Sequence, residues 1–424
     1  MLFLFYGSLT VKQVWYKMGG IISSMEENIL KSYVTEAVMK YHHAAIELSD
    51  ELYVHPELAG QEFQSSRKIV DILRQAGYQV EYPYLGNPTA FCGVLDNGDG
   101  PAAAILTEYD ALPELGHACG HNVHGSMSVL AALAMAELKN KYKGKIYVFG
   151  TPAEEGDGAK IGMAARGVFD DMSLALMIHS WSGGKSLANM NILSLRNYRI
   201  EFTGASAHAV AGPWKGHSAL ACARKFLDLI DARRECFTPD IHVNSVITKG
   251  GDYPSMLPDK AIVQLEMCTS SQKELNLIDK DIRKCAEGAC IALDCQVEFT
   301  KGFEDFADMV RVPVLENTVI ELFKELGQEY EEVKEAVASS DVGNVSYHCS
   351  AIQPLLSICD IFHALHTEKF REATIQPKAY EAIAVGAQII TSLVFRTMTD
   401  ENFRKDVYRS FKKELNKKET DEIF

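Results

Sequence analysis

The sequence predicts an α/β protein in which a mostly parallel sheet flanked by helices is interrupted by a smaller α+β domain. Apolar runs that resemble buried strands alternate with helical segments over 102–179, and this alternation is typical of a parallel sheet covered on both faces. From residue 193 the order becomes strand, helix, strand, strand, helix, strand, which is the split βαβ of a ferredoxin-like domain. We therefore expect one domain in two parts, residues 25–192 and 305–424, with residues 193–304 inserted between them.

Periodicity predicts the elements of the first part. Apolar positions at helical spacing begin at Glu26 and end before Pro56, and a second helix precedes Gly77. The runs "AAAILT", "KIYVFGT" and "LALMIH" indicate strands at 102–107, 145–151 and 174–179, with an Ala/Leu-rich helix at 125–144. Residues 1–24 are apolar but lack a basic start and a clear cleavage site, so Met25 is an alternative start of the domain.

The remaining elements follow the same reasoning. In the insert we expect strands at 195–204, 241–251, 261–269 and 295–301, and helices at 216–236 and 271–293. Beyond it, helical segments resume, and "AIQPLLSI" (351–358) predicts one more buried strand. The charged tail, 400–424, is expected to be a solvated helix.

Composition limits the function classes. The net charge of −15 over 424 residues argues against a nucleic-acid partner, which would require a basic face. The apolar start is too short to span a bilayer, so we expect no membrane association. The ten cysteines are scattered and include no CxxC pair, which indicates reduced thiols and a cytoplasmic protein.

Polar side chains collect where the predicted strands end. In open α/β sheets, ligands bind beyond the carboxyl ends of the strands, and four of those ends carry His, Cys, Asp or Glu: Glu108, Asp110, Cys119, His121, Glu154, Glu155, His179, His363 and His366. Each alone has a plainer interpretation, such as a hydrogen-bonded histidine or a solvated loop. A redox role for Cys119 would need a second cysteine nearby. Together they indicate a metal site.

The residue types suggest which metal. Imidazole, thiolate and carboxylate suit zinc, manganese or cobalt better than magnesium or calcium, which prefer all-oxygen ligands. The adjacent Glu154 and Glu155 can divide the work, one binding metal and one acting as a base. Because the candidate ligands exceed one tetrahedral shell, we expect two divalent metal ions. Two metals lower the pKa of a bound water and polarise a carbonyl or phosphoryl group.

Several motifs carry a resemblance to a known family: "EYDALPELGHACGHNVH", "TPAEEG", "MIHSW", "GASAHAVAGPWKGHSAL", "SSDVGNVS" and "ALHTEKF". The sequence resembles the aminoacylase and dipeptidase metallopeptidases, in the branch of indole-acetyl-amino-acid, hippurate-type and aminobenzoyl-glutamate hydrolases. The resemblance covers about residues 30–395. It implies a dinuclear zinc-peptidase-like catalytic domain, with the insert as a lid that forms a homodimer.

The resemblance also implies residue roles. The metal ligands would be Cys119, His121, Glu155, His179 and His366. Glu154 would be the general base, and Asp110 would orient a ligand histidine. His208 would reach across the dimer to the substrate carbonyl, and Asn244 would bind the substrate carboxylate. His124 would be a neighbour of the metals rather than a ligand.

The implied activity is metal-dependent hydrolysis of a small N-acyl amino acid, dipeptide or aminobenzoyl-glutamate-like amide. Three departures weaken a glutamate-type substrate: Asn122 and His217 replace residues common in relatives, and no arginine lies in or beside "SSDVGNVS". The alternative is a catalytically silent protein that binds a peptide or amino-acid conjugate on the same fold. A zinc nucleobase deaminase would need an HxE followed by PCxxC, and the sequence has neither.

Overall fold

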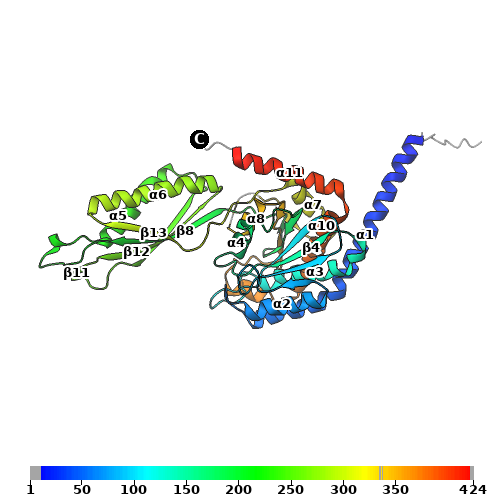
Figure 1. Ribbon diagram of the computed structural model, residues 1–424, viewed down its shortest axis with the longest axis horizontal. Helices are drawn as coiled ribbons and strands as arrows, with labels where there is room; N and C mark the ends of the chain where they lie inside the picture. Colours follow the sequence, from blue (N-terminus) through cyan, green and yellow to red (C-terminus); the bar gives the residue numbers. More distant parts are fainter. Residues whose placement is uncertain (1–10, 334–335, 337, 421–424) are drawn as a thin grey trace, which may run out of the picture.

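The computed structural model describes residues 11–333, 336 and 338–420. Figure 1 shows a larger region built on a central sheet and a smaller region to one side of it. The first ten residues of the apolar opening segment lie outside the described residues, and the rest of that segment belongs to a long helix, α1 (Val11–Val54). This helix ends two residues before Pro56, as its sequence predicts.

The central sheet has six strands in the order β1-β2-β4-β3-β5-β15. Their bounds are β1 (Gln79–Glu81), β2 (Phe91–Asp96), β3 (Ala102–Thr107), β4 (Lys145–Gly150), β5 (Leu174–Leu176) and β15 (Ala351–Ile352). β4, β3, β5 and β15 are parallel to one another, while β2 pairs antiparallel with β4 and with β1. The parallel part was predicted, and the antiparallel edge was not.

Two predicted strands are each split in the structure. The run 174–179 forms β5 and then β6 (His179–Trp181), and the run 351–358 forms β15 and then β16 (Leu355–Ser357). The first halves pair in the central sheet and the second halves pair in another, ordered β14-β7-β16-β6. Pro354 lies at the break in the second run, where it can donate no ladder hydrogen bond. The split turns His179 from a strand end into the start of a strand.

Helices cover the central sheet and complete its core. They are α2 (Phe63–Gln75), α3 (His121–Glu137), α4 (Ala159–Ala165), α7 (Pro313–Glu325), α8 (Val342–Ser346), α9 (Glu368–Ala373), α10 (Pro377–Thr399) and α11 (Glu401–Thr420). The short strands β7 (Ser186–Leu187) and β14 (Tyr330–Glu331) complete the second sheet. Among the described helices, only α10 has the length and composition of a membrane span. Most of it is buried, and it contributes to the same core as α1 and α3.

The tail helix α11 is not solvated as expected. Phe403, Val407, Phe411 and Leu415 recur at helical spacing and are buried in the main core. The charged residues between them occupy the outer face, and their number hides this apolar stripe when composition alone is considered.

The smaller region is a four-stranded sheet in the order β10-β12-β8-β13, with every neighbouring pair antiparallel. Its elements are β8 (Ser194–Thr203), α5 (Ala219–Arg233), β10 (His242–Lys249), β12 (Lys260–Thr269), α6 (Gln272–Leu293) and β13 (Gln296–Lys301). The helices and strands form a hydrophobic core separate from the main one. A two-stranded ribbon of β9 (Ala207–His208) and β11 (Met256–Leu257) extends from this sheet. The exact domain boundaries and the role of this region as a lid stay predictions.

Candidate metal centre

Asp110 ties two parts of the site together. It follows β3, and its Oδ1 lies 2.9 Å from Nδ1 of His121 at the start of α3. Its Oδ2 accepts a 3.0 Å hydrogen bond from the backbone N–H of Glu155. Burial disfavours a charged imidazole, but the Asp110 carboxylate outweighs that cost and raises the pKa of His121 to about 10. The same contact points the other ring nitrogen, Nε2, away from Asp110.

The turn before α3 depends on a glycine. Gly120 has φ 85°, and a Cβ at this position would lie 2.7 Å from the Cβ of Ser180. Only glycine combines this backbone angle with so close an approach. The turn places Cys119 on one side of Gly120 and His121 on the other.

Glu154 and Glu155 follow β4 in a loop that begins at Ala153, whose φ is 61°. Glu154 Oε2 and Glu155 Oε1 each lie 3.9 Å from Nε2 of His121. Burial raises the pKa of Glu154 well above its ordinary value, and the charges of Glu108 and Glu155 add to the effect. Burial also opposes ionisation of Glu155, but hydrogen bonding to His366 and the charge of His121 lower its pKa overall. The two neighbouring carboxyl groups are therefore driven toward different protonation states.

Cys119 and His179 face each other from the turn and from β6. Their Sγ and Nε2 atoms are 3.4 Å apart. Nδ1 of His179 lies 2.8 Å from the backbone oxygen of Ser180, to which it can donate, leaving the Nε2 lone pair directed at the sulfur. Burial, followed by the charge of Glu155, raises the pKa of the Cys119 thiol well above its ordinary value.

His366 closes the site from the loop after β16. Its backbone N–H donates to the carbonyl of Ala118, next to Cys119, and its φ is 60°. Its Nε2 lies 3.1 Å from Oε1 of Glu155. Residues from four segments far apart in sequence therefore meet at one place, as the strand-end argument predicts.

The donor atoms form groups of metal-binding size. Ligand atoms of Cys119, Glu155 and His366 lie within 4.8 Å of one another, and so do those of His121, Glu154 and Glu155. Glu155 belongs to both groups. Nε2 of His121 is buried and has no hydrogen-bond partner among the described residues, yet it faces two carboxylates at 3.9 Å. Atoms about 2.0–2.2 Å from a shared cation lie at that kind of separation, so the residues fit the expected metal ions.

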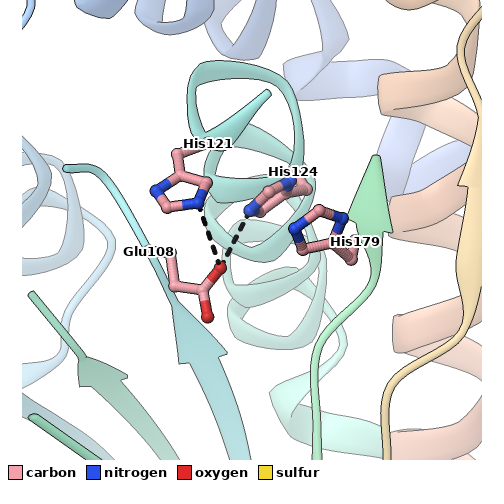
Figure 2. Close-up of side chains that lie close together, drawn as sticks. All are labelled: Glu108, His121, His124 and His179. Atoms are coloured by element: carbon pink, nitrogen blue, oxygen red, sulfur yellow. Dashed lines mark hydrogen bonds and ion pairs between the residues drawn. The ribbon is translucent and has the colours of Figure 1, made fainter. Parts of the chain in front are cut away.

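His124 lies beside this group but is already hydrogen-bonded at both ring nitrogens. Its Nδ1 accepts from the backbone N–H of Ser180 at 3.1 Å, and its Nε2 lies 3.0 Å from Glu108. Figure 2 shows Glu108 between the rings of His121 and His124, with His179 alongside. With no lone pair free, His124 is a neighbour of the site, which agrees with the expectation.

The sequence interpretation missed a fully buried ion cluster behind Glu154. Lys160 Nζ lies 2.6 Å from both Glu108 Oε1 and Asp341 Oδ1, and none of the three side chains is exposed. Oxygens of Glu108, Glu154 and Asp341 lie within 4.8 Å of one another. One signal was available: Lys160 is the only charged residue in the otherwise apolar helix α4, "AKIGMAA".

His208 and Asn244 lie outside this site. His208 pairs with Met256 in the β9–β11 ribbon, and Asn244 pairs with Glu266 in the edge strand β10. Figure 1 places β11 at the end of the smaller region farthest from α4 and α8. Neither residue lines the cavity at the metal-ligand group, so any contact with a substrate there would have to come from another copy of the chain.

A cavity of about 330 Å³ opens beside the grouped side chains. Cys119, Glu154, Glu155, His179 and His366 all line it. Its other walls come from the loop at 338–340, the strand β16 and the loop at 362–365. The candidate metal ligands and the candidate base therefore share one small-molecule-sized space.

Comparison with known proteins identifies the family. The model of peptidase family M20/M25/M40 matches residues 104–394. The chain is 30% identical to the Xaa-Arg dipeptidase of Mus musculus over 91% of this chain and 94% of that protein. It is 29% identical to one of the two kinds of chain of p-aminobenzoyl-glutamate hydrolase in Escherichia coli, over 63% of this chain and 59% of that protein.

Solved structures agree on the fold. A putative aminohydrolase from methicillin-resistant Staphylococcus aureus superposes with a TM-score of 0.73 at 19% identity, covering 87% of this chain and 100% of that one. A dinuclear metal binding peptidase of the M20 family from Bacillus subtilis gives 0.65 at 19% identity, covering 85% and 99%. The resemblance inferred from the motifs is confirmed: this chain is a hydrolase of the metallopeptidase type and belongs to peptidase family M20/M25/M40.

Proposed function

We propose that the protein hydrolyses the amide bond of a small dipeptide, N-acyl amino acid or aminobenzoyl-glutamate-like substrate, with Glu154 as the general base. One observation carries the proposal: Glu154 lines the cavity within 3.9 Å of the metal-facing nitrogen of His121, in surroundings that raise its pKa. A carboxylate with increased proton affinity suits a group that must accept a proton and then donate it near neutral pH.

The residues divide the work. Cys119, His121, Glu155, His179 and His366 would hold two divalent cations, which we propose to be zinc, manganese or cobalt. Bound there, the cations would supply the positive charge that activates water and polarises the amide carbonyl. Glu154 would remove a proton from the attacking water and deliver it to the leaving amine. Asp110 would hold the His121 ring and the Glu155 backbone in register.

The smaller region would complete the site in a homodimer. His208 would contact the substrate carbonyl from a second copy of the chain, and Asn244 would bind the substrate carboxylate. The position of the ribbon, at the far end of its own region, supports action on a partner copy rather than on its own cavity. We place the reaction in the cytoplasm, in keeping with ten free cysteines.

Dipeptides are the first substrates to test. The mouse relative over almost the whole chain is named a dipeptidase, and no arginine lies in or beside "SSDVGNVS" to bind a glutamate side chain. The assay is amine release by metal-stripped protein given manganese, zinc or cobalt, with dipeptides, N-acyl amino acids and aminobenzoyl-glutamate.

Glu154→Gln should lower kcat by about 10²–10⁴, with the metal content unchanged. Turnover that survives this substitution would contradict the assigned base. Bound metal without turnover of any compound by the wild-type protein would favour a silent binding protein.

A further inference from the structure

The cavity beside the metal-ligand group has an apolar half. Opposite the carboxylates and imidazoles, its lining includes Trp181, Met190, Leu355, Phe362 and Leu365. These side chains come from β6, from the segment after β7, from β16 and from the loop before His366. A space with reactive groups on one side and apolar walls on the other is the usual form of a specificity subsite.

Phe362 is the most unusual of these residues because it is 67% exposed. The backbone on both sides of it is nevertheless fixed. Gly183 and Gly184 donate backbone hydrogen bonds of 3.1 and 2.9 Å to the carbonyl of Cys359, and Ser182 Oγ donates to the carbonyl of His363 at 2.7 Å. An exposed aromatic ring held by ordered backbone on each side offers apolar area to a ligand at low entropic cost.

Gly183 fits this arrangement. Its φ is 92°, and a Cβ added there would touch the Cβ and Cδ2 of Phe362 at 3.6 Å. The backbone of 182–184 therefore lies directly against the Phe362 side chain and supports it at the mouth of the cavity.

The polar part of the same lining is uncharged away from the metal-ligand group. Among the described lining residues there is no Lys or Arg. Gln353 is fully buried, and neither its Nε2 nor its Oε1 has a hydrogen-bond partner among the described residues. Its backbone is fixed, because its N–H donates to Asn189 Oδ1 and its carbonyl accepts from Met190 N–H. An unpaired buried amide is costly, and a neutral donor–acceptor group of a ligand would offset that cost.

We propose that this cavity is a subsite for an apolar or aromatic group flanking the scissile amide, with Phe362 as its principal contact. An acidic group is disfavoured there, because the walls would desolvate it and the described lining provides no cation to pair with it. This inference rests on the proposed hydrolase function and specifies its substrate class.

The test compares two series of dipeptides on the metal-loaded protein. One series varies the first residue before a constant Arg (Ala, Leu, Phe, Glu), and the other varies the second residue after a constant Ala. In at least one series we expect kcat/KM to rise about tenfold or more from Ala to Phe and to fall for Glu. Phe362→Ala should remove the preference for Phe while retaining turnover of the Ala peptide.

Ile361→Ala is the matched control. Ile361 is the neighbouring residue, is 69% exposed, and does not line this cavity, so the preference should stay as in the wild type. Equal preferences in the wild-type and Phe362→Ala proteins, or a preference for Glu in both series, would overturn the inference.

A binding measurement separates failure of this inference from failure of the proposed hydrolysis. Titration calorimetry of the Glu154→Gln protein with the same peptides should show tighter binding of the Phe peptide, lost in Glu154→Gln/Phe362→Ala. If the wild type releases no amine but this selective binding is observed, the hydrolase proposal fails and the subsite stands. If turnover is observed without any dependence on Phe362, the hydrolase proposal stands and the subsite fails.

Discussion

The two regions of the molecule treat charge in opposite ways. The larger region buries Glu108, Lys160 and Asp341 completely, close to the metal-ligand group. In the smaller region, Arg196 is the only charged side chain that is buried within 194–301, a fully described range. Its core is otherwise built from apolar side chains and cysteines.

The difference indicates which region does chemistry. Burying ions is expensive, and well-packed apolar residues often stabilise a fold equally well. The smaller region shows that this chain can build a core without buried acids. The buried acids of the larger region are therefore best explained by the site beside them, where Glu108 and Asp341 surround Glu154.

The largest effect on stability should come from breaking the buried ion cluster. Lys160→Met leaves two buried carboxylates without their cation, so the free energy of unfolding should fall by about 3–5 kcal/mol. Urea unfolding measures the loss. Adding Asp341→Asn should recover part of it, because one unpaired charge is removed.

The control for that substitution is Lys145→Met. Lys145 pairs with Asp96 at 3.0 Å on the surface, and exposed pairs contribute little. Equal losses for the two variants would mean that the buried cluster has no special energetic role.

A core substitution in the smaller region should separate stability from chemistry. Ile282 is fully buried in the second core, and Ile282→Ala should cost about 2–5 kcal/mol. Elemental analysis should find the metal content unchanged. Loss of metal in a variant that remains folded would show that the two regions are coupled, and would contradict the contrast between them.

Asp110→Asn should weaken metal binding about 10–100-fold, since the carboxylate that orients His121 is lost. Equilibrium dialysis against a metal buffer measures the change. Asp170→Asn is matched to it: Asp170 also contacts a histidine, His348, at 2.7 Å, but outside the site. Equal weakening in both variants would count against a specific orienting role for Asp110.

The smallest expected effect is a pH dependence at the base of the smaller region. Burial opposes ionisation of Asp305, but hydrogen bonds from Arg196 and Lys301 lower its pKa overall. A lowered folded-state pKa gives stability that is present above the unfolded value of about 3.9 and is lost as the pH falls through the folded value. The difference in unfolding free energy between the wild type and Asp305→Asn should thus shrink below about pH 4. A difference that stays constant to lower pH would contradict this.

The sequence predicts the elements whose apolar pattern is local. The runs at 102–107 and 145–151 appear as β3 and β4 almost residue for residue. The split of β5 from β6 could not be inferred from "LALMIH", because it depends on pairing with β15 and β16, which lie far along the chain. Short strands such as β7 and β14 have the same origin.

The same limit applies to the site. The strand-end rule and the motifs bring Cys119, His121 and Glu155 together in advance, because each lies after a predicted strand. The contact of Lys160 with Asp341 spans 181 positions, and nothing local to either residue indicates the partner. Phe362 was likewise invisible, since an exposed aromatic residue in a loop has no pattern of its own.

The central claim is that side chains from separate segments of the larger region hold two metal ions. The most direct measurement is the number of zinc, manganese or cobalt ions per chain after dialysis, determined by elemental analysis for the wild type and for Glu155→Gln. The account predicts two ions in the wild type and a loss of one or both in the variant, because Glu155 belongs to both donor groups. A wild-type protein without stoichiometric metal, or a variant that keeps two ions, would contradict it.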